Sequence, residues 1–133
     1  MKVLFVCEGN AARSQMAQAF YNNATRSTDA ESAGTIVDIT GLVPPKVILV
    51  MNELGIPMDA HFRKQITREM FDAAERVILM TQNSLPDYLQ GDKVTFWDVD
   101  DPRHKEMDVF YRVRGEIQKK VEELIADDER KTS

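Results

Sequence analysis

The chain has 133 residues, which is enough for one compact domain with a buried core and too few for two. Hydrophobic residues make up 43% and charged residues 29% of it, the ordinary balance of a globular protein, and no stretch approaches the roughly 18 apolar residues that span a bilayer. The formal net charge of -5 argues against nucleic acid or an anionic membrane as the main partner, so we predict neither.

The first half of the chain reads as two strand-and-helix pairs. Residues 2–7 (KVLFVC) form a nearly continuous apolar run that is typical of a strand buried on both faces. Residues 14–25 follow with apolar side chains at helical spacing, and residues 29–33 are a short strand candidate. A predicted helix over residues 44–54 opens on a proline pair and closes before a glycine.

The second half continues this alternation. Thr67 is expected to cap a short helix, because its hydroxyl is able to accept a hydrogen bond from an amide of the first turn. Residues 76–80 (RVILM) and 93–97 (KVTFW) are predicted strands, with a short helix over residues 85–89 between them. Apolar residues then repeat every four positions from Val109 to Ile125, which marks the buried stripe of a long helix.

These elements predict a single domain over residues 1–126, followed by an all-polar tail over residues 127–133 that we expect to fray. Strands and helices in alternation favour an α/β fold with three layers, in which helices cover both faces of a four-stranded parallel sheet. In such sheets the ligand site lies at the carboxyl ends of the strands. Cys7, Met80 and the loop after Trp97 all lie at such ends.

The segment from Cys7 to Ser14 joins the first predicted strand to the first helix. A short loop there directs backbone N–H groups toward one point, and the amino end of the helix adds a partial positive charge. Gly9 and Asn10 tolerate the left-handed backbone that such a turn requires. Arg13 is able to donate two hydrogen bonds to an anion bound at that point. The same groups would stabilise the thiolate form of Cys7. We predict that a tetrahedral oxyanion is bound by a run of seven residues: Glu8, Gly9, Asn10, Ala11, Ala12, Arg13 and Ser14.

A simpler interpretation makes Cys7 a small buried residue at the end of a strand and Arg13 a solvated charge at the start of a helix. The five residues between the cysteine and an Arg-Ser pair, at a strand-to-helix junction, instead favour a catalytic thiolate that attacks the bound anion. Cys7 is the only cysteine, so it has no intrachain disulfide partner, and we expect a cytoplasmic location in which it stays reduced.

The stretch VCEGNAARSQMA over residues 6–17 resembles the phosphate-binding loop of the low-molecular-weight protein tyrosine phosphatase superfamily, which includes the thioredoxin-type arsenate reductases. The resemblance extends to the SAGT motif over residues 32–35, to His61 in HFRKQIT and to the late Asp101-Pro102 pair. It covers nearly the whole chain in the right order, and implies the three-layer fold of that family.

The resemblance implies that Asp101 is the residue that moves protons to and from the oxygens of the anion, because it alone among its neighbours precedes proline. Asp98 and Asp100 are rival candidates, and a purely solvated acidic loop is the simpler alternative. Cys7, Arg13 and Asp101 are thus the expected catalytic residues.

Three further residues are implied to support the loop. By resemblance, Asn10, Ser32 and His61 form a hydrogen-bond network that fixes its shape. Ser14 either donates a hydrogen bond to the thiolate of Cys7, which would assist it as a leaving group, or is an ordinary serine at a helix start.

The cysteine count bears on the reaction. Reduction of arsenate needs a second thiol, and the thioredoxin-coupled reductases of the family carry two further cysteines, neither of which is present here. Ala12 also stands where many phosphatases of the family hold a second loop cysteine. A relay within the chain is therefore excluded, and a reductase would borrow an external thiol, such as glutathione with glutaredoxin, or mycothiol.

The resemblance also bears on phosphotyrosine, whose ring needs flat apolar walls. The family supplies them at positions that here read Ile36-Val37-Asp38-Ile39 and Arg103-His104, and RSQMA and WDVDDP are closer to the reductase branch. We therefore favour arsenate reduction with an external thiol. The alternatives are a phosphomonoesterase acting on a phosphoprotein and, third, a phosphate-binding module without catalysis. We predict no bound cofactor and no metal site.

Overall fold

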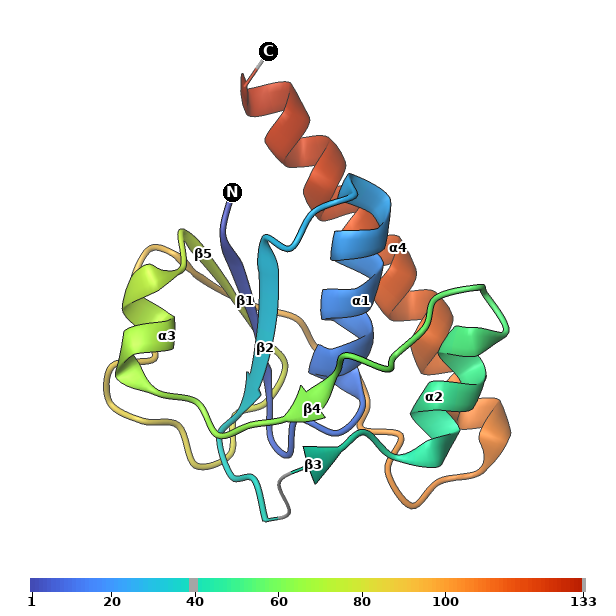
Figure 1. The fold of residues 1–133 in the computed structure, drawn as a ribbon. Coiled ribbons are helices and arrows are strands. Elements are labelled where there is room, and N and C mark those ends of the chain that lie inside the picture. Colours follow the sequence, from blue (N-terminus) through green and yellow to red (C-terminus); the bar gives the residue numbers. More distant parts are fainter. Residues whose placement is uncertain (39–40, 133) are drawn as a thin grey trace.

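A computed structural model describes residues 1–38 and 41–132 (Figure 1). Its main sheet has four parallel strands in the order β2-β1-β5-β6, namely β2 (Ala30–Gly34), β1 (Val3–Cys7), β5 (Arg76–Leu79) and β6 (Val94–Phe96). The strands β3 (Gly41–Leu42) and β4 (Phe62–Arg63) form a separate short antiparallel pair, which the sequence did not predict. The predicted α/β fold with a four-stranded parallel sheet is confirmed.

The helices cover both faces of this sheet, as the three-layer prediction requires. They are α1 (Arg13–Thr25), α2 (Pro45–Asn52), α3 (Arg68–Ala73) and α4 (Met107–Thr132). Figure 1 shows α1, α2 and α4 on one side of the sheet and α3 on the other. Thr67 caps α3 through its side chain, as expected. None of the helices over the described residues combines the length and the apolar composition that a membrane span requires.

The central strand β1 explains why the molecule has two cores. Successive side chains of a strand point to opposite faces, and all of β1 is buried. Phe5 and Cys7 therefore pack with α1, α2 and α4, whereas Leu4 and Val6 pack with α3. The repeat of the long helix is also confirmed, since Val113, Ile117 and Val121 are fully buried in the first core.

Two local predictions were wrong. Residues 85–89 form turns rather than a helix. Leu89 donates to the carbonyl of Pro86, which closes one turn, and a segment this short gains too few hydrogen bonds to offset the cost of helix nucleation. At the carboxyl end, α4 continues to Thr132 instead of fraying from Asp127. An ion pair of 2.7 Å between Arg76 and Asp128 anchors its last turns to the sheet.

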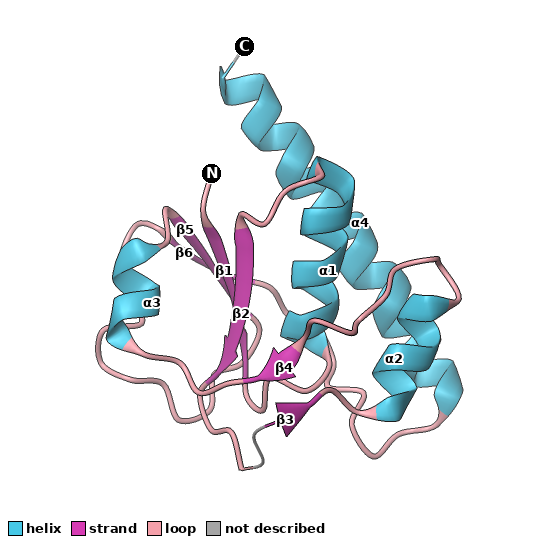
Figure 2. Cartoon of the chain, viewed as in Figure 1, coloured by secondary structure: helices cyan, strands magenta, loops and turns pink. Residues whose placement is uncertain are grey.

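The fold brings the predicted functional segments to one end of the sheet. Cys7 ends β1, Gly34 ends β2, and Met80 and Trp97 follow β5 and β6 directly. Figure 2 shows the loops that follow these strands at the end of the sheet opposite to the two chain termini. The carboxyl ends of the parallel strands therefore meet where a ligand site is expected.

Candidate active site

The loop between β1 and α1 is held from outside through its carbonyl groups. Thr35 donates its backbone N–H to the carbonyl oxygen of Cys7 at 3.0 Å, and Ile36 donates to that of Glu8 at 2.8 Å. Both donors come from the segment that follows β2, so the neighbouring strand continues its pairing alongside the loop.

Side chains hold the next two carbonyl groups. Arg63, at the end of β4, donates to the carbonyl oxygen of Gly9 through Nε at 3.2 Å and through Nη2 at 3.0 Å. Gln15 donates to the carbonyl oxygen of Asn10 at 3.2 Å. Arg63 is 8% exposed, and these two hydrogen bonds hold its guanidinium against the backbone of the loop.

These contacts fix the direction of the amides. No peptide bond in the described chain is cis, and in a planar trans peptide the C=O and the following N–H point in opposite directions. Because the carbonyls of residues 7–10 accept hydrogen bonds from outside the loop, the N–H groups of Glu8, Gly9, Asn10 and Ala11 point to its inside. Asn10 adopts the left-handed conformation that this turn requires, with φ of 51°, whereas Gly9 does not need it. Inward amides next to the amino end of α1 form a cradle for an anion.

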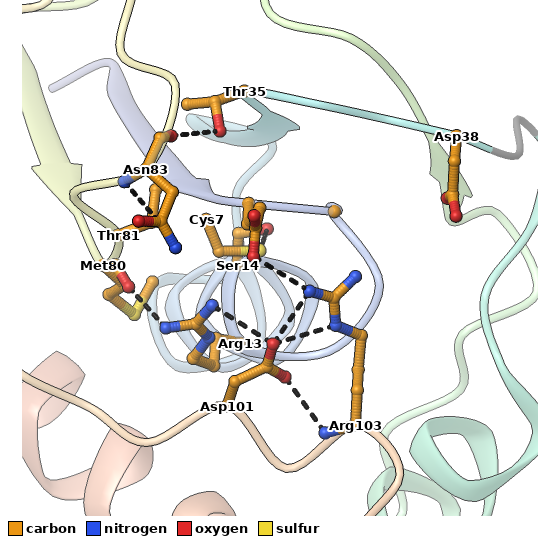
Figure 3. Close-up of polar contacts among 12 residues, drawn as sticks. Cys7, Arg13, Ser14, Thr35, Asp38, Met80, Thr81, Asn83, Asp101 and Arg103 are labelled. Atoms are coloured by element: carbon orange, nitrogen blue, oxygen red, sulfur yellow. Dashed lines mark hydrogen bonds and ion pairs between the residues drawn. The ribbon is translucent and has the colours of Figure 1, made fainter.

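Cys7 lies at the base of this cradle. It is 2% exposed, and its Sγ lies 3.0 Å from the hydroxyl oxygen of Ser14 (Figure 3). Asn10 donates through Nδ2 to the same oxygen at 2.8 Å, which fixes the position of the hydroxyl. A thiolate carries no proton, so the hydroxyl of Ser14 is the donor whenever Cys7 is ionised.

Arg13 is anchored rather than solvated. Its Nη1 donates to the carbonyl oxygens of Met80 at 2.5 Å and Val99 at 3.1 Å, which come from the loops after β5 and β6. The side chain is 8% exposed, and its Nη2 lies 3.6 Å from Asp101 Oδ2. Two backbone carbonyls therefore hold the guanidinium in one orientation at the side of the loop, with its charge beside Asp101.

Asp101 lies at the mouth of the loop, between two guanidinium groups (Figure 3). Its carboxylate accepts from the backbone N–H of Arg103 at 3.0 Å and from Nε of Arg103 at 2.9 Å. Burial alone raises the pKa of Asp101, but the hydrogen bonds from Arg103 and the charge of Arg13 outweigh it, so the pKa lies below its ordinary value. Asp101 is thus held as a carboxylate.

The two rival carboxylates are placed differently. Asp100 is exposed and pairs with Arg112 at 3.0 Å on α4. Asp98 is exposed and lines a cavity of about 380 Å³ together with Glu8, Arg13 and Asp101. Of the three, Asp101 alone forms an ion pair with Arg13. Asp101 is therefore the carboxylate that lies closest to the guanidinium of Arg13 at the mouth of the loop.

The implied supporting network was partly wrong. Ser32 is buried, but it donates to Oε1 of Gln18 at 2.6 Å on α1 and does not bond to Asn10. Asn10 Oδ1 instead accepts from Nε2 of Gln15 at 3.0 Å and from the backbone N–H of Lys64 at 2.9 Å. Gln15, which no motif in the sequence had singled out, is therefore the residue that holds Asn10 from the helix side.

His61 joins the network through Gln15. Its Nδ1 lies 2.9 Å from Oε1 of Gln15, whose Nε2 already donates to Asn10. An amide oxygen accepts only, so Nδ1 of His61 carries the proton. Burial, and then the nearby charge of Lys64, lower the pKa of His61, which keeps the ring neutral. Its role in this structure is to position Gln15 and thereby Asn10.

Gly34 is required by the close approach of β2 to the loop. A Cβ at this position would lie 2.7 Å from the carbonyl oxygen of Glu8 and 2.9 Å from the backbone nitrogen of Asn10. Such distances are shorter than real Cβ contacts, so any side chain here would push the loop away. Within the SAGT motif, Gly34 therefore leaves room for the loop, and Thr35 donates a backbone hydrogen bond to it.

Arg103 is the main feature that sequence reasoning missed. Its Nη2 lies 3.3 Å from Oε2 of Glu8, so the guanidinium reaches over the loop from the Asp101 side (Figure 3). A Cβ at Gly9 would lie 2.2 Å from its Nη1, which shows how closely it covers the backbone. The only signal in the sequence was a cation at a position where an aromatic side chain was expected.

The chain is similar to known proteins over nearly its whole length. The model of the family described as low molecular weight phosphotyrosine protein phosphatase matches residues 2–133. The chain is 33% identical to the glutaredoxin arsenate reductase of Synechocystis sp., covering 94% of this chain and 96% of that protein.

Two solved structures show the same likeness. An arsenate reductase from Archaeoglobus fulgidus is 33% identical with a TM-score of 0.78, and the match covers 94% of this chain and 99% of that one. An arginine phosphatase from Geobacillus stearothermophilus is 27% identical with a TM-score of 0.84, over 98% of this chain and 94% of that one. Both reductases and phosphatases thus share this fold.

Proposed function

Because this chain belongs to the low molecular weight phosphotyrosine protein phosphatase family of enzymes, we propose that it reduces arsenate through Cys7 with electrons from an external thiol. In this proposal the inward N–H groups of the loop and the guanidinium of Arg13 bind the oxyanion, and the sulfur below attacks it. Donors aimed at a bound oxyanion also stabilise the charge that its oxygens gain during the attack.

In the first step, the thiolate of Cys7 attacks arsenic in the arsenate monoanion. A sulfur–arsenic bond forms and one arsenic–oxygen bond breaks, and the oxygen leaves as water with the two protons that the monoanion carries. Arsenic stays pentavalent. Since no outside proton is needed, this step proceeds with Asp101 ionised, the state in which Arg103 and Arg13 hold it.

In the second step, an external thiolate attacks the sulfur of Cys7. A disulfide bond forms and the sulfur–arsenic bond breaks, and its electron pair stays on arsenic, which is reduced to arsenite and takes up protons from water. A second external thiol then releases Cys7 as a thiolate. The hydroxyl of Ser14, 3.0 Å from Sγ, stabilises that leaving thiolate. In the overall reaction, one arsenate and two thiols give one arsenite, one disulfide and one water.

The observation that carries the choice of reaction is the 33% identity to the glutaredoxin arsenate reductase of Synechocystis sp. over 94% of this chain. The lowered pKa of Asp101 agrees with a first step that needs no outside proton. The single cysteine fixes the source of the electrons, because a chain with one cysteine must obtain its second thiol from outside. We place the enzyme in the cytoplasm, where a lone thiol stays reduced.

The main alternative is a phosphomonoesterase with a cysteinyl-phosphate intermediate. It is favoured by the place of Asp101 at the mouth of the loop, 3.6 Å from Arg13, and by the arginine phosphatase among the similar structures. The substrate would then be a phosphoprotein. The third candidate is a phosphate-binding module without catalysis. Such a module would not need the 3.0 Å contact between the hydroxyl of Ser14 and Sγ of Cys7.

A paired assay tests the proposal. Purified protein is given arsenate with glutathione and glutaredoxin, with mycothiol or with dithiothreitol, and separately an aryl phosphate and a phosphopeptide. We expect arsenite to form in stoichiometry with disulfide, and Cys7→Ser to abolish it. Fast ester hydrolysis without arsenite production would establish the phosphatase instead. Absence of both activities, with phosphate still bound, would establish the binding module.

A further inference from the structure

A second cavity opens beside the catalytic loop. It has a volume of about 490 Å³ and reaches the loop at Ala11 and Ala12. Its walls also include Lys46 and Phe110, from helices α2 and α4. This size lies within the range of pockets that hold small organic ligands.

The cations that line this cavity are not equally engaged. Arg63 pairs with Asp38 at 3.1 Å, and Arg103 pairs with Asp101 and with Glu8 at the mouth of the loop. Lys46 is exposed, and its Nζ lies 3.3 Å from the carbonyl oxygen of Lys105, a neutral partner that leaves its charge in place. An exposed ammonium group at the wall of a cavity, with the further N–H groups of Arg103 beside it, favours an anionic ligand.

Two of these cations connect the cavity to the catalytic loop. Arg63 donates to the carbonyl oxygen of Gly9, and Nη2 of Arg103 lies 3.3 Å from the carboxylate of Glu8. Figure 3 shows the guanidinium of Arg103 directed from its own loop toward the loop that carries Cys7. A ligand that pairs with Arg103 in the cavity therefore has its anionic group next to the mouth of the active site.

We propose that this cavity binds the electron donor, and that the donor is a low-molecular-weight thiol that carries carboxylates. The inference rests on the proposed function, which requires a thiol from outside the chain. Carboxylates of the donor pair with Lys46 and Arg103, its apolar atoms lie against Phe110, and its sulfur is directed to the adduct on Cys7. An acidic phosphopeptide is the competing occupant.

Charge reversal at Lys46 tests the cavity without touching the catalytic loop. Lys46→Glu is compared with Lys119→Glu, an exposed lysine of α4 outside the cavity, because both change the net charge equally. Glutathione serves as the acidic thiol and dithiothreitol as the neutral one. We expect Lys46→Glu to raise the KM for glutathione about tenfold, and to leave both the rate with dithiothreitol and the KM for arsenate unchanged. Lys119→Glu should resemble the unmodified protein.

Binding of S-methylglutathione, measured by calorimetry, adds a readout that does not depend on turnover. We expect binding to the unmodified protein and to Lys119→Glu, and a loss with Lys46→Glu. Arsenate reduction with dithiothreitol, together with a glutathione KM that Lys46→Glu does not change, would overturn the cavity assignment and leave the reductase intact.

Binding without turnover would distinguish the thiol site from the proposed reductase activity. S-methylglutathione binding that depends on Lys46, with no arsenate reduction by any thiol, would overturn the reductase and leave the site. If Lys46→Glu impairs only the hydrolysis of an acidic phosphopeptide, the cavity belongs to that substrate and the thiol proposal is wrong.

Discussion

Arg103 binds Asp101 at two points, through its backbone N–H to Oδ1 at 3.0 Å and through Nε to Oδ2 at 2.9 Å. The side-chain hydrogen bond raises the pKa of Arg103. Both hydrogen bonds help to lower the pKa of Asp101 below its ordinary value. The residue that follows the Asp-Pro pair thus favours the ionised form of Asp101, the group on which the phosphatase and reductase mechanisms differ.

Removing Arg103 should therefore change how ester hydrolysis depends on pH. In Arg103→Gln the pKa of Asp101 rises, so the carboxyl group stays protonated to higher pH. Hydrolysis of an aryl phosphate with a poor leaving group then persists to higher pH than in the unmodified protein. The pH profile of kcat measures this shift.

Arg112→Gln is the matched control for this profile, because Arg112 pairs with the neighbouring Asp100 at 3.0 Å. The control variant should follow the unmodified protein. Equal profiles for Arg103→Gln and Arg112→Gln would contradict the role given to Arg103.

Arg13→Lys should weaken phosphate and arsenate binding together, by roughly ten- to a hundredfold. A lysine keeps the charge but lacks the planar fork, so it is unable to bond to Met80 and Val99 while also facing the anion. Calorimetric titration with both oxyanions measures the effect. Undiminished binding of either one would show that the guanidinium faces something other than the anion.

Gly34→Ala should damage the loop while leaving the sheet in place. The added Cβ would lie 2.7 Å from the carbonyl oxygen of Glu8, so the loop must shift at a cost of about 1–3 kcal/mol in the free energy of unfolding. Urea unfolding measures the loss, and oxyanion titration should show weaker binding. Gly115→Ala is the control, since a Cβ there meets no atom within 4 Å. Equal behaviour of the two variants would argue against the contact.

His61 gives a prediction for stability against pH. Its pKa in the folded protein lies below the ordinary value of 6.5, so below that pH the unfolded chain takes up a proton more readily than the folded one. The stability due to a neutral His61 is thus present at higher pH and is lost as the pH falls through 6.5. Relative to His61→Gln, the unmodified protein should lose free energy of unfolding between about pH 7 and pH 5. A difference that is the same at both pH values would be inconsistent with a buried neutral ring.

The strand, loop and helix that contain Cys7, Asn10 and Arg13 were predictable because their signals are local. An apolar run, a five-residue spacing and a helical pattern lie within one continuous segment. Asp101 was predictable from the proline that follows it. The placement of these residues at the carboxyl ends of parallel strands then follows from the alternation of strands and helices.

The contacts that complete the site were not predictable in the same way. Arg63 reaches Gly9 across 54 positions and Arg103 reaches Glu8 across 95, and no periodicity in the sequence links such pairs. The resemblance placed Ser32 in the network, yet its side chain meets Gln18 on α1. Ile39, one of the residues considered for the missing aromatic wall, lies outside the described residues.

The most direct test of a nucleophilic sulfur beneath a bound oxyanion is to compare binding and turnover in Cys7→Ser. Calorimetric titration with arsenate and phosphate should show binding close to that of the unmodified protein, because the amides and Arg13 remain. Arsenite production and ester hydrolysis should both fall by at least about a thousandfold. A Cys7→Ser protein that keeps either activity would show that the sulfur is not the attacking atom.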